Sequence, residues 1–253
     1  KPEEQIVGWT IGALIGGLAQ ALIQIPVLIR KGASYSPKVL FRHPGIRKMG
    51  RLLLPAVFSN SVGQLNIVIV NTAIASMLGS AVITYLYYGY RLMQLPVGMF
   101  GVAIATASFP MIAEQIAKKD IYETRKTISF SLRMTVFMTV PAMFGLIALS
   151  LPINRLLFQH GRFTAEDVAA TSLANIFYCL GITAYSGSKI LNQVFFAMHD
   201  SKIPMKFSIA AMVSHIGMSL FLIKFTTLGF MGLALSSSIS GMLNFFLLLA
   251  AAR

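Results

Sequence analysis

Seven stretches of apolar residues, each about 20 residues or longer, follow one another along the chain. None shows the alternation of apolar and polar positions that marks a membrane β-barrel, so each predicts a helix that satisfies its own backbone hydrogen bonds. The expected fold class is all-α: a polytopic helical membrane protein with about seven transmembrane helices. The predicted spans are residues 6–29, 52–78, 81–113, 128–153, 168–197, 205–225 and 228–250.

Composition supports this class and excludes two others. Of 253 residues, 56% are apolar and 11% are charged, whereas soluble domains carry about 25% charged residues. A soluble enzyme of this composition would expose a largely apolar surface and aggregate. The net charge of +13 does not indicate a nucleic-acid-binding face, because the basic residues form short clusters between the apolar stretches.

The distribution of Lys and Arg predicts the orientation of the spans. The loops after the first, third and fifth spans, together with the chain's end, hold 14 of the 21 basic residues, and the opposite side holds 4. Because loops rich in Lys and Arg stay in the cytoplasm, we expect the first set to be cytoplasmic. The chain begins with Lys1 rather than Met and shows no signal peptide, so we expect a piece of a longer protein.

Two basic residues lie deep inside predicted spans. Arg91 is about 15 Å along a helix from the start of its span, and Lys189 lies about 14 Å from the opposite face. All eight acidic residues fall in loops or at span ends, and a lone charge at the bilayer centre costs about 2.5 to 3.5 kcal/mol. We therefore predict that both cations line a hydrated cavity for an anionic substrate, since Arg offers a bidentate fork and Lys a point charge. The alternative is an ion pair with an acid in a missing part of the protein.

Uncharged polar residues also occur inside the spans. Helical spacing places Ser188, Lys189 and Asn192 on one face of the fifth span, with Tyr185 one turn earlier. Asn60 is a comparable polar residue in the second span. We predict that Ser188, Asn192 and Asn60 contribute to substrate binding, although interhelical hydrogen bonds explain many such residues.

No arrangement of residues indicates an enzyme. A membrane enzyme needs a nucleophile, an acid–base pair or a metal cluster, and here the four His residues are scattered and the acids are peripheral. We predict no catalytic residue, no metal site and no cofactor. His215 is interpreted as a hydrogen-bonded packing residue rather than a proton carrier, and no repeated filter-like loop supports a channel.

The third span contains residues that loosen helices. Pro96 is followed closely by Gly98 and Gly101, which weaken the backbone ladder and allow close helix approach. Transporters place such residues at hinges and gates, and we predict that role here. A straight helix over residues 81–117 would be about 55 Å long, so we expect it to be kinked, tilted or partly interfacial.

Three sequence stretches carry a resemblance to a known family. From Tyr87 the chain reads YYGYRLMQLPVGMFGVAIATASFP, from Leu157 it reads LFQHGRFTAEDVAATSLANIFYCLGITAYSGSKIL, and from Phe195 it reads FFAMHDSKIPMK. In this order they resemble the MurJ (MviN) lipid II flippases of bacteria, and they cover most of residues 50–250. The RLMQLPVGMFGVA run is the most specific of these matches.

The resemblance implies a fold of the multidrug/oligosaccharidyl-lipid/polysaccharide (MOP) exporter class, with two six-helix lobes in a V around a cationic cavity. Residues 1–30 would be the last helix of the N-terminal lobe, 31–50 a cytoplasmic basic linker and 51–253 the six-helix C-terminal lobe. The implied partners are lipid II, membrane lipids and the missing N-terminal lobe, with no nucleic acid. The resemblance further suggests a monomer in the bacterial inner membrane.

The implied activity is movement of lipid II, the undecaprenyl-pyrophosphate-linked peptidoglycan precursor, from the inner to the outer leaflet by alternating access. Arg91 matches the family's cavity arginine and Lys189 a basic residue of a second stretch, so the diphosphate is expected to sit against both. A flippase for another polyprenyl-diphosphate glycan, or a MATE-like exporter of the same fold, remains the alternative. A pump for cationic drugs is disfavoured because it would place acids in the cavity.

Two departures from the family pattern stand out. Many members have Asp immediately before the cavity arginine, and here that position is Tyr90. Some members are thought to bind sodium through acids near the positions of Asn71, His215 and Ser219, and none of these three residues is acidic. The resemblance therefore does not imply sodium coupling for this chain.

Overall fold

The computed structural model describes residues 2–30, 32, 57, 61, 66 and 68–252. The chain divides into two compact units, Lys1–Arg47 and Lys48–Arg253. The first unit contains helix α1, Pro2–Arg30. Its apolar side chains, such as Leu18 and Ile23, are exposed within that unit, as expected for a helix that faces lipid or another part of a membrane protein.

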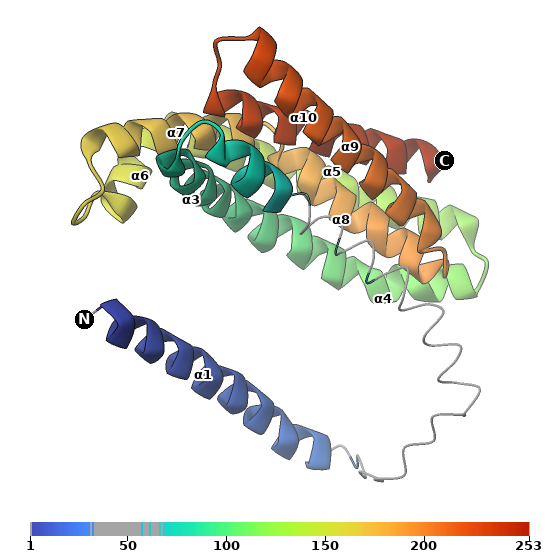
Figure 1. Ribbon diagram of the computed structural model, residues 1–253. Coiled ribbons are helices and arrows are strands. Elements are labelled where there is room, and N and C mark those ends of the chain that lie inside the picture. The colour runs from blue at the N-terminus through green and yellow to red at the C-terminus, as the bar shows by residue number, and fades with distance from the viewer. Residues whose placement is uncertain are drawn as a thin grey trace. The chain divides into compact units, whose positions relative to one another are not determined.

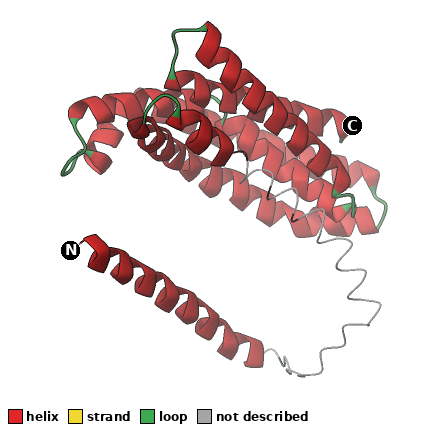
Figure 2. Ribbon diagram, viewed as in Figure 1, coloured by secondary structure: helices red, strands yellow, loops and turns green. Residues whose placement is uncertain are grey.

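The second unit is a bundle of helices (Figure 1). Figure 2 shows helices joined by short loops, with no strand in the described ranges. Two of the helical segments have the wider π-helical turn. In chain order the elements are η1 (Ile69–Ile74), α3 (Ser80–Pro96), η2 (Val97–Val102), α4 (Ala103–Ala117), α5 (Ile121–Ala148), α6 (Ser150–Phe158), α7 (Ala165–Cys179), α8 (Ile182–Ala197), α9 (Lys202–Phe225) and α10 (Phe230–Ala251).

The helices confirm the predicted class, a polytopic all-α membrane protein. Within the described residues, five helices are long and apolar enough to cross a membrane, or six if the bent pair α7 and α8 counts as one span. These correspond to six of the seven predicted spans. The remaining prediction, residues 52–78, lies mostly outside the described residues.

Helix α8 occupies the centre of the second unit and packs against α5, η2, α4 and α10. Glycines allow the close contacts: a Cβ atom at Gly187 would clash with the ring of Phe245 on α10, and one at Gly101 would lie 2.7 Å from Ser186 Cβ. Hydroxyl side chains of α10, including Ser236 and Ser238, are buried in the same core. Tight packing through small and hydroxyl residues is how membrane helices associate, since lipid provides little hydrophobic drive.

The over-long third span is a continuous helical stretch that changes type in its middle. It runs over Ser80–Ala117, and the π-helical segment η2 begins directly after Pro96. Proline lacks the backbone N–H that an α-helix needs and crowds the preceding turn, and a local π segment is one way to absorb this mismatch. The predicted irregularity at this point is therefore present as a widened turn.

The predicted uninterrupted span 168–197 is wrong in detail, because α7 and α8 meet at an angle of 47°. The break falls at Gly181, whose Cβ position would lie 3.0 Å from Ser238 Oγ of α10. Ser238 Oγ donates to the carbonyls of Phe177 (2.6 Å) and Tyr178 (3.2 Å) at the end of α7. The Tyr178 carbonyl also accepts the backbone N–H of Gly181 at 3.1 Å. The α10 hydroxyl therefore adds a donor at the point where the helix is interrupted.

The predicted span 128–153 also differs from the structure. Helix α5 ends at Ala148, and the separate short helix α6 begins at Ser150. Ser150 is buried and its hydroxyl donates to the carbonyl of Ser172 on α7, at 2.9 Å. This contact holds α6 against α7. A hydropathy pattern gives no information about such contacts between helices.

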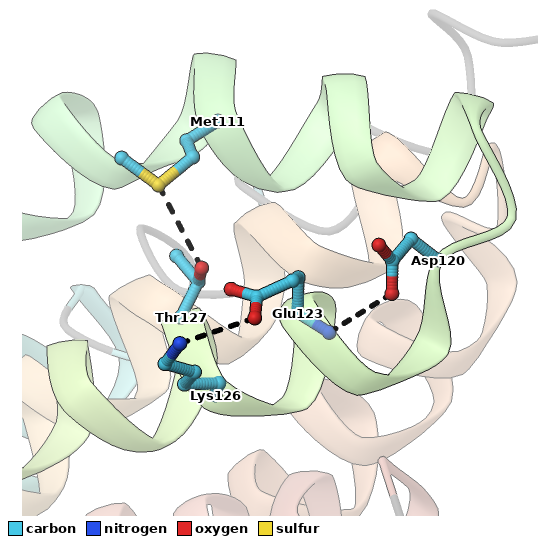
Figure 3. A network of polar contacts seen from close by, with 5 residues as sticks. All are labelled: Met111, Asp120, Glu123, Lys126 and Thr127. Atoms are coloured by element: carbon cyan, nitrogen blue, oxygen red, sulfur yellow. Dashed lines mark hydrogen bonds and ion pairs between the residues drawn. The ribbon is translucent and has the colours of Figure 1, made fainter.

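A network of polar contacts surrounds the loop between α4 and α5, which is predicted to be cytoplasmic (Figure 3). Asp120 caps α5 by accepting the backbone N–H of Glu123 at 3.1 Å, and Lys126 pairs with Glu123 at 3.1 Å. Thr127 donates to Met111 Sδ at 3.6 Å across the two helices. The cap is the more stabilising of these contacts, about 1 kcal/mol, because exposed ion pairs contribute little.

Candidate functional site

Arg91 lies on the uncovered side of α3, where a single tyrosine holds it. Its Nε and Nη2 atoms donate to Tyr87 Oη at 3.1 Å and 2.8 Å, and its Cζ atom lies 5.1 Å from the centre of the Tyr87 ring. Tyr87 is 49% exposed and Arg91 is also exposed. The two residues are one helical turn apart and therefore form one exposed polar group on this face.

The opposite face of α3 is fixed against α7. Asn175 Nδ2 donates to the carbonyl of Gly89 at 3.0 Å, and a Cβ atom at Gly89 would lie only 3.0 Å from the Asn175 backbone nitrogen. Nearer the start of the helix, Tyr85 Oη donates to the carboxylate of Asp167. These contacts set the rotation of α3 about its axis, which leaves Arg91 on the uncovered side.

Tyr90, which stands where many family members have an acid, belongs to the covered side. Its ring lies 5.6 Å from that of Tyr178 on α7, and its hydroxyl accepts a hydrogen bond from Gln94 Nε2. Tyr90 makes no hydrogen bond to Arg91 in the described part of the chain, so the phenol of Tyr87 is the group that orients the guanidinium.

Lys189 occupies the only open strip of the central helix. It is the one exposed residue between Gly181 and Ala197, a range described in full. The other sides of α8 are covered; one such contact is the hydrogen bond from Thr139 of α5 to Thr183, at 3.2 Å. No described carboxylate lies within ion-pair distance of Lys189 or Arg91.

The uncharged candidates have different surroundings. Asn192 is half-buried, and its Oδ1 is itself buried, without a hydrogen-bond partner among the described residues. Ser188 does not share the open face as expected: it is 5% exposed and donates to the carbonyl of Ala184 at 2.9 Å. One residue step turns a helix by about 100°, so Ser188 lies on the covered side beside Lys189. Asn60 lies outside the described residues.

Arg91 and Lys189 lie at different levels of the lobe. Tyr90 contacts Tyr178, so the neighbouring Arg91 lies at about the height of Tyr178 along the helix axes. Lys189 is eleven residues beyond Tyr178. At about 1.5 Å per residue the two cations are separated by roughly 15 to 20 Å along the helices. The Arg91 guanidinium is also turned toward Tyr87, one turn further from Lys189.

The predicted hinge residues sit between these two levels. Pro96 is buried at the end of α3, and Gly98 and Gly101 are in η2. Gly101 packs directly on Ser186 of α8, whereas no atom lies within 4 Å of a Cβ placed at Gly98. The two glycines therefore differ: one is required by packing, and the other faces open space. Hinge motion itself stays a prediction.

His215 is buried and hydrogen-bonded, as the interpretation as a packing residue expects, and that interpretation stays a prediction. Its Nδ1 lies 2.9 Å from Asn66 Oδ1, and one turn later Ser219 and Ser236 share a hydrogen bond at 2.7 Å. Within the described residues, no group of three His, Cys, Asp or Glu side chains could hold a metal ion. Arg91 and Lys189 are exposed cations without a described carboxylate partner, which makes them candidates for binding an anion.

Sequence analysis missed Tyr87 as a site residue. Its spacing of four residues before Arg91 is the signal that could have found it, because side chains at i and i+4 meet on a helix. Exposed aromatic residues are common in membrane helices, so the spacing alone does not separate a partner of Arg91 from a lipid-facing ring.

Comparison with known proteins identifies the family. A family model described as lipid II flippase MurJ matches residues 1–253. The chain belongs to the lipid II flippase MurJ family. With its several apolar helices, this membership identifies a multi-pass protein of the bacterial inner membrane.

Curated MurJ relatives match nearly the whole chain. A probable lipid II flippase MurJ of Vibrio cholerae is 36% identical over 246 residues, covering 97% of this chain and 46% of the relative. The corresponding Haemophilus influenzae protein is 37% identical, covering 94% of this chain and 47% of the relative. The chain thus spans about half the length of these MurJ proteins, which are named as flippases and not as enzymes.

Solved structures agree with this assignment. A lipid II flippase MurJ in an inward closed conformation matches with a TM-score of 0.73 and 29% identity, covering 94% of this chain and 49% of that one. The Vibrio cholerae MATE transporter VcmN in its bent form matches with a TM-score of 0.76 at 16% identity, covering 93% of this chain and 52% of the transporter. The second match shows the fold alone, which the MurJ family shares with MATE transporters of the MOP superfamily.

Proposed function

We propose that the transporter containing this chain is a lipid II flippase that moves the undecaprenyl-pyrophosphate-linked peptidoglycan precursor from the inner to the outer leaflet by alternating access. Its membership of the MurJ family supports this activity. The observation that carries the proposal is the exposed, acid-free position of Arg91 on an apolar span. A cation kept at that depth needs water or an anion beside it.

The diphosphate is the group that these cations would recognise. The guanidinium of Arg91 offers paired N–H donors that match two phosphate oxygens, and Lys189 offers a mobile point charge. Asn192 lies three residues from Lys189, and its amide oxygen is buried without a described partner. It would accept from a hydroxyl or amide of the saccharide-peptide head once movement of the lobes exposes it. The polyprenyl chain stays in lipid.

The separation of Arg91 and Lys189 favours successive binding over a joint clamp. By the predicted orientation Lys189 lies nearer the cytoplasm and Arg91 nearer the outer side. A diphosphate entering from the inner leaflet would meet Lys189 first and reach Arg91 as the site opens outward. The π-helical segment with Pro96, Gly98 and Gly101 lies between the two levels and would serve as the hinge.

The rest of the transporter supplies the other wall of the cavity. Residues 1–30 would be the last helix of the N-terminal lobe, 31–50 a basic cytoplasmic linker and 51–253 the C-terminal lobe. Rocking of the two lobes about the substrate gives alternating access, and a single copy of the transporter suffices for this mechanism.

The test is rescue of bacteria depleted of their own lipid II flippase, using the full-length gene. We expect the intact gene and Arg133→Ala to restore growth and Arg91→Ala to fail at equal membrane abundance. Arg133 is a matched control because it is also an exposed arginine within a span, on α5. Failure of the intact, inserted protein would refute the lipid II assignment, and rescue by Arg91→Ala would refute the cavity arginine.

The second candidate is a flippase for another polyprenyl-diphosphate glycan, which would use the same two cations. Reconstituted protein that transports such a glycan but leaves lipid II in the inner leaflet would favour it. A MATE-like exporter of cationic drugs is supported by fold alone, and the absence of acids from the apolar spans of this sequence argues against it.

A further inference from the structure

The hydrogen bonds of Arg91 leave one edge of its guanidinium free. Arginine carries five N–H donors, and Tyr87 Oη accepts from Nε at 3.1 Å and from Nη2 at 2.8 Å. These two donors form the side edge of the guanidinium. The end edge, made by Nη1 and the second hydrogen of Nη2, has no partner among the described residues and can take two oxygens of an anion.

The Tyr87 hydroxyl keeps its own hydrogen available. A phenol can accept and donate at once, and Tyr87 donates to no described group while it accepts from Arg91. Because Tyr87 is 49% exposed on the same face, an anion on the Arg91 end edge would lie within reach of this donor. The pair then offers three donors to one ligand.

Contacts with neighbouring aromatic rings hold the Tyr87 ring in place. It contacts the Tyr88 ring edge-on, with centres 5.8 Å apart, and Tyr88 stacks on Phe158 at 4.4 Å. Tyr88 also meets Phe163 edge-on at 5.7 Å. This aromatic row joins α3 to α6 and the loop after it, so the phenol that orients Arg91 is attached to a packed part of the lobe.

We propose that Tyr87 and Arg91 form one composite anion site, in which Tyr87 both positions the guanidinium and donates its O–H to the ligand. The inference rests on the proposed function, since it takes Arg91 to be the diphosphate-binding arginine. The ligand class is a phosphoryl or diphosphate group, which presents at least three oxygens to the three donors.

The test is a double-mutant cycle on the purified full-length transporter, with farnesyl diphosphate as the probe. Tyr87→Phe should weaken binding about 3- to 10-fold, because the hydroxyl is lost and Arg91 must be ordered by the ligand itself. Arg91→Ala should weaken binding more, and adding Tyr87→Phe to Arg91→Ala should change it by less than about 2-fold. Tyr88→Phe is the matched control, since it removes a hydroxyl from the neighbouring ring that does not contact Arg91, and it should bind like the parent.

The outcomes separate this inference from the proposed function. Parent-like binding by Tyr87→Phe, while Arg91→Ala is impaired, would overturn the role of Tyr87 and leave the arginine site standing. If Tyr87→Phe weakens binding equally in the parent and in the Arg91→Ala background, Tyr87 does not act through Arg91. Parent-like binding by Arg91→Ala would overturn the arginine site itself. Arg91→Lys gives a second check: Lys lacks the two-donor side edge, so Tyr87→Phe should matter less in that background.

Discussion

Adding a methyl group at Gly101 should destabilise the lobe, whereas the same change at Gly98 should not. Both glycines lie in the π-helical segment η2, three residues apart. A Cβ atom at Gly101 would lie 2.7 Å from Ser186 Cβ and 2.8 Å from Ser186 Cα, while no atom lies within 4 Å of a Cβ at Gly98. Gly101→Ala and Gly98→Ala therefore differ in packing but share nearly the same change in helix propensity.

The magnitude follows from this pairing. Replacing Gly by Ala in a helix gains about 1 kcal/mol at either position, so the gain cancels in the comparison. The nearest atoms at Gly101 belong to the backbone and Cβ of buried Ser186, which cannot rotate away. Overpacking of this kind costs about 1 to 3 kcal/mol, which corresponds to a melting temperature lower by about 2 to 10 °C.

The assay is thermal unfolding of the purified full-length protein and its two variants in the same detergent. We expect Gly98→Ala to melt at or slightly above the parent and Gly101→Ala to melt clearly below Gly98→Ala. Equal melting temperatures for the two variants would refute the close approach of η2 and α8. That result would also remove the structural basis for the level assigned to Lys189 relative to the hinge.

Three further predictions concern the core, a helix start and the open strip. Ser238→Ala should lower the melting temperature, because the Phe177 carbonyl at the α7–α8 break loses the Ser238 hydroxyl at a cost of about 1 to 3 kcal/mol. Ser240→Ala, whose Oγ has no described partner, is the control, and an equal effect of the two substitutions would contradict the argument. Asp167→Asn should weaken the capping box of α7 and the hydrogen bond from Tyr85 to residue 167. Backbone amides at the start of α7 should then exchange faster with solvent, and an unchanged exchange rate would contradict the stabilising role of the cap. The Lys189→Cys variant should react with a membrane-impermeant thiol reagent at position 189, whereas the buried Cys179 should not react. If position 189 fails to react in every conformational state, the open strip of α8 is not hydrated.

The predicted features that the structure bears out depend on local properties of the chain. Helix type and approximate span positions follow from apolar length, because each span satisfies its own backbone hydrogen bonds. The irregular turn after Pro96 lies where the sequence places Pro96, Gly98 and Gly101, residues that weaken a helix. Arg91 and Lys189 are selected from their expected depth, because the cost of burying a charge in lipid does not depend on which helices are neighbours, and their role in binding stays a prediction.

Other features could not be read from the sequence because they depend on distant helices. The break at Gly181 is stabilised by Ser238 of α10, and hydropathy carries no signal of that contact. Helical spacing placed Ser188 with Lys189, but the surrounding helices bury Ser188 and leave Lys189 exposed.

By itself the sequence determined the membrane class and the approximate positions of most helical spans, because both are set by the transfer of residues between water and lipid. Only the tertiary structure decided which face of each helix stays open, how far apart Arg91 and Lys189 lie, and that Tyr87 orients the arginine. The reason is that packing between helices is a property of pairs of surfaces. Gly89 packs on Asn175, and Gly101 packs on Ser186. The need for glycine at these positions can be recognised only when the partner residue is known.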